Sequence, residues 1–151
     1  MIKAILSDCD GVLTDGFVYT DEFGRETRRY CTYDGTAIKR AENNGITVYF
    51  ITNERNECHM RRAEKLGVRI FQTNDKGKWA KDHIKVPFAA ITDTDSDVGL
   101  LRIAKCAYVP KNAPFTADEN VKIVRTNTAM GCGVLDEVVS RIIEHNKNYA
   151  Y

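Results

Sequence analysis

The sequence predicts an α/β fold in which a Rossmann-like parallel sheet carries helices on both faces. Three observations support this prediction: short apolar runs alternate with helix-like segments, polar side chains follow the apolar runs, and the length of 151 residues suits one domain. Short continuous apolar runs are typical of strands that are buried on both sides of a parallel sheet. We therefore expect residues 1–151 to form a single domain.

Six apolar runs are expected to form the strands. They are Ile2–Ser7, Thr47–Ile51, Arg69–Phe71, Ala89–Thr92, Ala107–Val109 and, as a sixth, Val121–Val124. Helical composition predicts helices at Gly35–Asn44, Arg55–Leu66, Val98–Ala104 and Val134–Asn146, with a short helix near Lys78. The first two end at Gly45 and Gly67, and glycine commonly terminates helices.

One segment interrupts this alternation. Phe17–Thr20 and Thr27–Cys31 flank a turn-forming stretch that contains Gly24. The pattern predicts a β-hairpin directly after the first strand and its loop. We expect this hairpin, at about residues 17–31, to be a small flap beside the ends of the strands.

Composition argues against several classes of protein. Lys and Arg total 22 against 21 for Asp and Glu, so the net charge of +1 creates no field that favours nucleic acid. The apolar runs fall far short of the roughly 20 residues that span a membrane, and the N-terminus turns polar too early for a signal peptide. The five cysteines lack the spacing of a disulfide framework or zinc site. We expect a cytoplasmic protein that binds neither nucleic acid nor membranes, with Cys58-His59 on an ordinary helix surface.

Acidic and hydroxyl side chains cluster where three predicted strands end. Asp8 and Asp10 follow the first strand, Thr52 and Asn53 end the second, and acidic and hydroxyl residues fill positions 92–97 after the fourth. Parallel sheets bind ligands at the carboxyl ends of their strands. An isolated Asp-x-Asp pair could equally be a solvated loop or a helix cap. Together with their companions and a nearby lysine, these residues favour a site for Mg²⁺ and a phosphoryl group.

Residues 8–16, Asp-Cys-Asp-Gly-Val-Leu-Thr-Asp-Gly, resemble the DxDGxxTDG signature of the small-cap branch of the haloacid dehalogenase (HAD) superfamily. Weaker matches follow in the family's order, at residues 34–35, 51–54, 62–67, 92–97 and 131–133. The resemblance covers essentially the whole chain. This branch holds the 3-deoxy-manno-octulosonate 8-phosphate phosphatases, the related nine-carbon keto-acid phosphatases, and the C-terminal domains of some acylneuraminate cytidylyltransferases.

The resemblance implies a covalent mechanism. Asp8 would be the nucleophile that forms an aspartyl-phosphate, and Asp10 would be the general acid that protonates the leaving alcohol and then the base toward water. The carboxylates of Asp8 and Asp93, with the backbone carbonyl of Asp10, would hold Mg²⁺.

The resemblance also implies a phosphate-binding set. Thr52 and the backbone amide of Asn53 would bind phosphate oxygens, a lysine would neutralise their charge, and Asp97 would support the metal or the lysine. The lysine is ambiguous, because both Lys76 and Lys78 follow Phe71-Gln72 near the family position. Lys78 precedes Trp79 and so keeps the local pattern, which favours Lys78.

The implied function is hydrolysis of a small sugar phosphate, 3-deoxy-manno-octulosonate 8-phosphate or a related nine-carbon keto-acid phosphate. Two departures from the family pattern bear on it: Thr92-Asp93-Thr94 lacks the family glycine, and Asp136 stands where relatives have arginine. The alternative is a catalytically weak oligomerising domain associated with acylneuraminate cytidylyltransferase. The intact set of Asp8, Asp10, Thr52 and Asp93 favours the enzyme.

The resemblance further implies a homotetramer, since relatives cover their open sites by packing hairpins together. Phe17, Tyr19, Phe23 and Tyr30 could supply that interface, or could pack onto their own domain.

Overall fold

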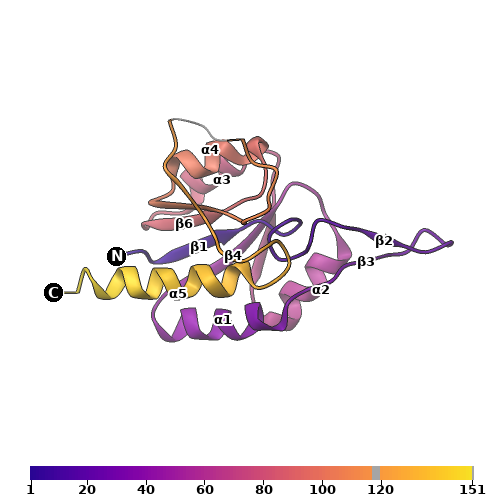
Figure 1. Cartoon of the computed structure of the whole chain (residues 1–151), viewed down its shortest axis with the longest axis horizontal. Helices are drawn as coiled ribbons and strands as arrows, with labels where there is room; N and C mark the ends of the chain where they lie inside the picture. Colours follow the sequence, from indigo (N-terminus) through magenta and orange to yellow (C-terminus); the bar gives the residue numbers. More distant parts are fainter. Residues whose placement is uncertain (117–119, 151) are drawn as a thin grey trace.

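A six-stranded sheet forms the centre of the protein, in a computed structural model that describes residues 1–116 and 120–150 (Figure 1). Its strands are β1 (Ala4–Ser7), β4 (Thr47–Thr52), β5 (Arg69–Gln72), β6 (Phe88–Ile91), β7 (Cys106–Val109) and β8 (Ile123–Arg125). They lie in the order β5-β4-β1-β6-β7-β8, and every neighbouring pair is parallel. The predicted α/β class is therefore confirmed.

The direction in which the sheet grows reverses beside β1. From β1 the chain adds β4 and then β5 on one side, and it later adds β6, β7 and β8 on the other side. The chain therefore leaves the neighbouring strands β1 and β6 in opposite directions along the sheet. Such a reversal is where open α/β sheets bind their ligands.

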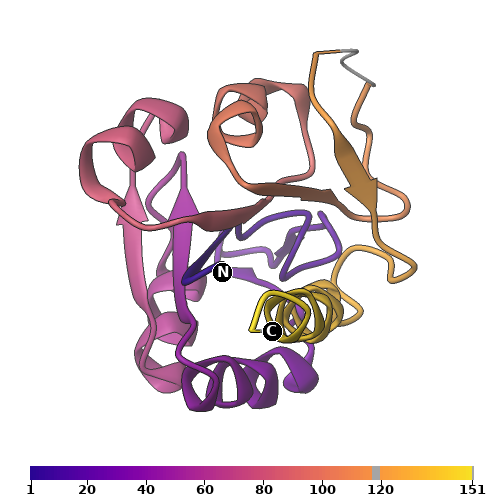
Figure 2. The ribbon, with the colours of Figure 1, turned by 90° about the vertical axis from the view of Figure 1, so that its left-hand side faces the viewer.

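Helices cover both faces of the sheet (Figure 2). On one face lie α1 (Thr32–Asn43), α2 (Glu57–Leu66) and α5 (Val134–Lys147); on the other lie α3 (Lys76–His83), the 3-10 turn η1 (Asp95–Asp97) and α4 (Val98–Ile103). Each face buries its own apolar cluster, one including Ile38 and Val138 and the other including Leu100 and Leu101. Burial of these side chains is the main force that holds the helices on the sheet.

A short hairpin leaves the body of the protein after β1 (Figure 1). Its antiparallel strands β2 (Tyr19–Thr20) and β3 (Glu26–Thr27) are shorter than the sequence predicts. The expected pairing is missing at the ends away from the turn, at residues 17–18 and 28–31. The turn itself lies where the sequence predicts it, and there the Asp21 carboxylate accepts hydrogen bonds from the backbone amides of Phe23 and Arg25. The hairpin itself is confirmed.

The other predicted elements all occur, with shifted ends. The largest shift is at α1, which begins three residues earlier than predicted, and the sixth strand lies at Ile123–Arg125 instead of Val121–Val124. Within the described ranges, no helix is both long enough and apolar enough to cross a membrane.

Candidate active site

A cavity of about 230 Å³ opens at the carboxyl ends of β1, β4 and β6. It is lined by Asp8, Asp10, Thr52, Asn53, Glu54, Lys76, Asp93, Thr94 and Asp97. Every predicted site residue except Lys78 is in this group. A larger cavity of about 490 Å³, beside Lys105, Lys122 and His145, contains none of the predicted residues.

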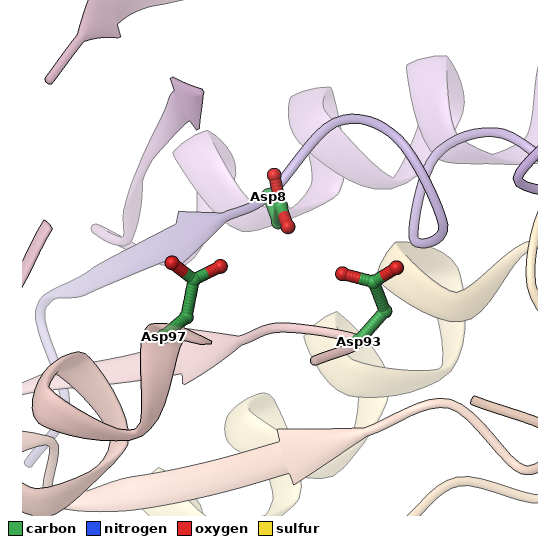
Figure 3. Close-up of side chains that lie close together, drawn as sticks. All are labelled: Asp8, Asp93 and Asp97. Atoms are coloured by element: carbon green, nitrogen blue, oxygen red, sulfur yellow. The ribbon is translucent and has the colours of Figure 1, made fainter. Parts of the chain in front are cut away.

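Three carboxylates converge in the cavity. Asp8 follows β1, and Asp93 and Asp97 point toward it from the segment after β6 (Figure 3). One oxygen from each carboxylate lies within 4.8 Å of the other two. Burial raises the pKa of Asp8 well above its usual range, although Lys76 opposes this effect, and burial also raises the pKa of Asp93.

This cluster fits a divalent cation. Its donors are hard carboxylate oxygens, the kind that Mg²⁺ prefers, and they repel one another when ionised without a counter-charge. The raised pKa values of Asp8 and Asp93 are consistent with a place where added positive charge would stabilise the ionised forms. The carboxylates of Asp8, Asp93 and Asp97 are the groups that could hold the ion.

Lys76 is the lysine of the cavity, and the prediction that favoured Lys78 is wrong. Lys76 Nζ lies 2.9 Å from Asp8 Oδ1 and 2.7 Å from Asp97 Oδ2, and the residue is 3% exposed. Lys78 instead points to solvent and pairs with Asp82 at 2.7 Å. The start of α3 explains the difference, because the Asp75 carboxylate caps the helix and makes Lys76 its first residue.

Close helix packing helps to place Lys76. A Cβ added to Gly77 would lie 2.9 Å from the backbone carbon of Gly99, so the absence of a side chain lets α3 approach α4. This approach brings Lys76 beside Asp97, which directly precedes α4.

Gly11 has a similar steric role on the other side of the cluster. Its φ of +77° is unfavourable for residues with a side chain, and an added Cβ would overlap the carboxylate of Asp93. The glycine of the first motif thus makes room for Asp93.

Three side chains contact Asp10. Arg28 Nε donates a hydrogen bond to its Oδ1 at 2.9 Å, Thr14 Oγ1 donates to the same oxygen at 3.2 Å, and His59 Nε2 lies 3.0 Å from its Oδ2. Burial favours the neutral acid, but His59 and Arg28 outweigh this effect and lower the pKa of Asp10 to about 2. The expectation that Cys58-His59 lies on an ordinary helix surface is wrong for His59, which is 1% exposed.

Thr52 and Asn53 stand at the end of β4, on the rim of the cavity. Thr52 is buried and its hydroxyl donates a hydrogen bond to the carbonyl of Glu54 at 3.0 Å, whereas Asn53 is exposed. The hydroxyl is therefore fixed in place by a local hydrogen bond.

Sequence reasoning alone gave no site role to three of the residues described above. Glu54 lines the cavity, while Arg28 and His59 contact Asp10. Arg28 lies in the hairpin and His59 in α2, 18 and 49 positions along the chain from Asp10. No spacing pattern links such distant positions, and only the docking of the hairpin and α2 brings them together.

Comparisons with known proteins agree with this geometry. No family model matches the chain. The 3-deoxy-D-manno-octulosonate 8-phosphate phosphatase of Salmonella typhi is 33% identical over 118 residues, which cover 78% of this chain and 54% of that protein. The phosphatase of the same name from Haemophilus influenzae is 33% identical over 70 residues, or 46% of this chain and 39% of that protein. The chain thus spans about half or less of the length of these curated relatives.

Solved structures match over nearly the whole chain. The cobalt-bound form of the Haemophilus influenzae octulosonate phosphate phosphatase has a TM-score of 0.87 at 25% identity, over 97% of this chain and 90% of that one. A protein from Legionella pneumophila described as a HAD superfamily hydrolase of subfamily III A has a TM-score of 0.83 at 28% identity. The match covers 99% of this chain and 85% of that one. The chain has the HAD fold.

A third HAD-fold neighbour was solved with ligands. The octulosonate phosphate phosphatase from Moraxella catarrhalis, in complex with magnesium, phosphate and KDO, has a TM-score of 0.84 at 26% identity, over 98% of this chain and 89% of that one. The resemblance found in the motifs is thus confirmed by sequence and by structure.

Two departures from the HAD motifs have local explanations. Asp136 does not line the cavity: its Oδ1 accepts hydrogen bonds from Arg40 at 3.1 Å, which joins α5 to α1. In the fourth motif, Thr92 is fully buried and the Thr94 hydroxyl lies 2.8 Å from that of Ser96. The substituted residues are therefore accommodated without displacing Asp93 from the cavity.

Proposed function

We propose that this protein is a magnesium-dependent phosphomonoesterase that hydrolyses a small sugar phosphate, 3-deoxy-D-manno-octulosonate 8-phosphate or a related nine-carbon keto-acid phosphate. One observation carries the proposal: the cavity combines the carboxylates of Asp8, Asp93 and Asp97 with a buried ammonium group, that of Lys76. The names of the relatives, and the ligands of the Moraxella catarrhalis protein, support it.

The reaction begins with attack by Asp8. A carboxylate oxygen of Asp8 forms a bond to phosphorus, the bond from phosphorus to the sugar oxygen breaks, and that oxygen takes a proton from Asp10. A water molecule then attacks phosphorus and gives a proton to Asp10, and the bond between phosphorus and Asp8 breaks. Inorganic phosphate leaves, and both carboxyl groups return to their starting forms.

Other residues offset the charge of the phosphoryl group. Lys76 supplies an ammonium beside Asp8, and the Thr52 hydroxyl and the Asn53 backbone amide, in the same cavity lining, would bind phosphate oxygens. Mg²⁺ held by Asp8 and Asp93 would reduce the repulsion between a carboxylate nucleophile and a dianionic phosphate.

Asp10 must be protonated when it acts as an acid, although its pKa is about 2 in the protein alone. A dianionic phosphate that enters the cavity would raise this pKa, because a nearby negative charge disfavours the ionised carboxylate. After this transfer Asp10 is ionised, and in the second step its carboxylate accepts a proton from the attacking water.

A homotetramer in the cytoplasm completes the proposal. The cavity of about 230 Å³ is small compared with the roughly 300–1,000 Å³ of typical ligand sites, so one subunit leaves a sugar phosphate partly uncovered. Phe17, Tyr19 and Phe23 of the hairpin are 69%, 50% and 74% exposed, as an interface between subunits would require. Tyr30 packs on its own domain instead.

The test is phosphate release from a panel of sugar phosphates and an aryl phosphate, with Mg²⁺ and with a chelator. We expect release that needs Mg²⁺ and is abolished by Asp8→Asn, while Asp82→Asn, at an exposed position on α3, keeps wild-type activity. If the folded wild-type protein releases no phosphate from any substrate, the alternative of an oligomerising domain associated with acylneuraminate cytidylyltransferase takes its place.

A further inference from the structure

His59 is a buried side chain whose two ring nitrogens both face other functional groups. Its Nε2 lies 3.0 Å from Asp10 Oδ2, and its Nδ1 lies 2.7 Å from the Tyr30 hydroxyl. The Tyr30 ring meets the imidazole edge-on, with 5.9 Å between ring centroids. Burying the two ring nitrogens costs free energy unless each finds a hydrogen-bond partner, so His59 needs both Asp10 and Tyr30.

The partners determine which nitrogen carries the proton. An ionised carboxylate can only accept hydrogen bonds, so the Nε2 that faces Asp10 must be the protonated nitrogen. In the neutral ring Nδ1 is then an acceptor, and the Tyr30 hydroxyl donates to it. Burial raises the pKa of Tyr30, which keeps this hydroxyl protonated.

Nε2 depends on Asp10 for its partner. Within the described residues the buried Nε2 has no aligned hydrogen bond, and the Asp10 carboxylate is the group that it approaches. Catalytic hydrogen bonds are often poorly aligned before substrate binds and tighten afterwards. The imidazole is thus positioned to hold Asp10 Oδ2 once the carboxyl group adopts its working orientation.

We propose that His59, itself held by Tyr30, is a positioning residue that fixes Asp10 for proton transfer to the leaving group. The inference rests on the proposed function and deepens it. Asp10 lies in the loop after β1, and its side chain is 48% exposed toward the cavity, so it can rotate unless its oxygens are held. Arg28 holds Oδ1 from the hairpin, and His59 on α2 places its Nε2 3.0 Å from Oδ2. A misplaced reacting group can lower a rate about 100-fold.

Leaving-group dependence separates a positioning role from a merely structural one. An alkyl phosphate such as a sugar phosphate releases a basic alkoxide that needs a proton, whereas p-nitrophenyl phosphate releases a stable phenolate. His59→Leu is expected to lower kcat about 100-fold on the sugar phosphate and less than about threefold on p-nitrophenyl phosphate. His59→Gln, whose amide can still donate to Asp10, should recover at least about tenfold, and Tyr30→Phe should show the same selectivity more weakly. His145→Leu, at the far end of α5, is the control that should change neither rate.

The outcomes separate this inference from the proposed function. If His59→Leu lowers both rates equally, or neither, while the wild-type protein is active, the positioning role is overturned and the phosphatase function stands. If the wild-type protein hydrolyses no substrate, the proposed function fails, and ¹⁵N NMR of the His59 ring then decides the geometry. A ring protonated at Nε2, with signals altered by Asp10→Ala and Tyr30→Phe, supports the contacts of His59 with Asp10 and Tyr30. A ring protonated only at Nδ1 overturns them.

Discussion

The ammonium group of Lys76 lies 2.7 Å from Asp97 Oδ2, and both side chains are almost completely buried. The same ammonium lies 2.9 Å from Asp8 Oδ1, so Asp97 fixes the position from which Lys76 approaches Asp8. Burial favours an uncharged lysine, but Asp8 and Asp97 outweigh it and raise the pKa of Lys76. A charged ammonium is thus available in the cavity beside Asp8.

The first prediction concerns this lysine. Lys76→Met should lower kcat/KM for phosphate release about 10²–10³-fold, because it removes a fixed charge that stabilises the phosphoryl group in the transition state. Lys78→Met, two positions along the same helix, removes an exposed charge and should leave activity within about twofold. Steady-state kinetics of both variants make the comparison. A larger loss of activity in Lys78→Met than in Lys76→Met would instead favour Lys78 as the phosphate-binding lysine.

The second prediction concerns metal binding. Mg²⁺ at about 100 times its dissociation constant should stabilise the protein by about 2.7 kcal/mol, which corresponds to a rise in Tm of roughly 5–10 °C for a chain of this size. Asp93→Asn should remove most of this rise, since it removes one of the three clustered carboxylates. Asp82→Asn should keep it. Calorimetry with Mg²⁺ and with a chelator provides the measurement, and an equal rise in Asp93→Asn would argue against Asp93 as a ligand.

The third prediction separates backbone strain from overlap at Gly11. Gly11→Ala should abolish Mg²⁺-dependent activity, because its Cβ would displace the Asp93 carboxylate. Gly45→Ala introduces a side chain at a similar φ of +70°, but nothing lies within 4 Å of its Cβ. This control should lose about 1 kcal/mol of stability and keep its activity. Urea unfolding and phosphate release of the two variants test the difference.

The sequence predicts the fold well because each element has a local signal. Apolar runs mark the strands, and stop signals such as Gly67, which adopts φ +68° at the end of α2, mark the helix ends. The residues after β1, β4 and β6 could likewise be assigned to one cavity, because the carboxyl ends of parallel strands share one edge of the sheet.

The errors concern which way a side chain points. Lys76 and Lys78 lie within one helical turn, and the capping by Asp75 and the close contact at Gly77 decide which of them enters the cavity. His59 depends on the docking of α2 against the hairpin, which no local pattern encodes. Packing between elements that are distant in the sequence therefore decides which side chains enter the site, and local sequence patterns do not predict this.

The fourth prediction concerns the hairpin. Size-exclusion chromatography with light scattering should give a mass of about four times 17.1 kDa for the wild-type protein. Replacing Phe17 and Phe23 together by Ser should give monomers with an unchanged circular dichroism spectrum, because both rings are largely exposed in one subunit. Tyr149→Ser, at an exposed aromatic residue beyond α5, should leave the mass unchanged. A wild-type monomer at micromolar concentration would contradict the tetramer.

The fifth prediction is a pH dependence of stability that comes from Asp34 on α1. Its side chain is buried, its Oδ1 accepts a hydrogen bond from the Asp136 amide, and its Oδ2 has no partner among the residues described. Burial raises the pKa of Asp34 to about 6, although the Asp136 amide opposes the effect. Because the folded state binds this proton more tightly than the unfolded state, the contribution to stability is present at low pH and is lost as pH rises through about 6.

Asp34→Asn removes this contribution while keeping a side-chain oxygen for the Asp136 amide. Between pH 4.5 and pH 7.5 the free energy of unfolding of the wild-type protein should therefore fall by about 2 kcal/mol more than that of Asp34→Asn. Urea unfolding at the two pH values measures this difference, in which the other titrating groups cancel. Glu42→Gln, at an exposed acid of the same helix, controls for the loss of one carboxylate. If the free energy of unfolding changes with pH equally in the wild-type protein and in Asp34→Asn, ionising Asp34 costs no free energy in the folded protein and the prediction is wrong.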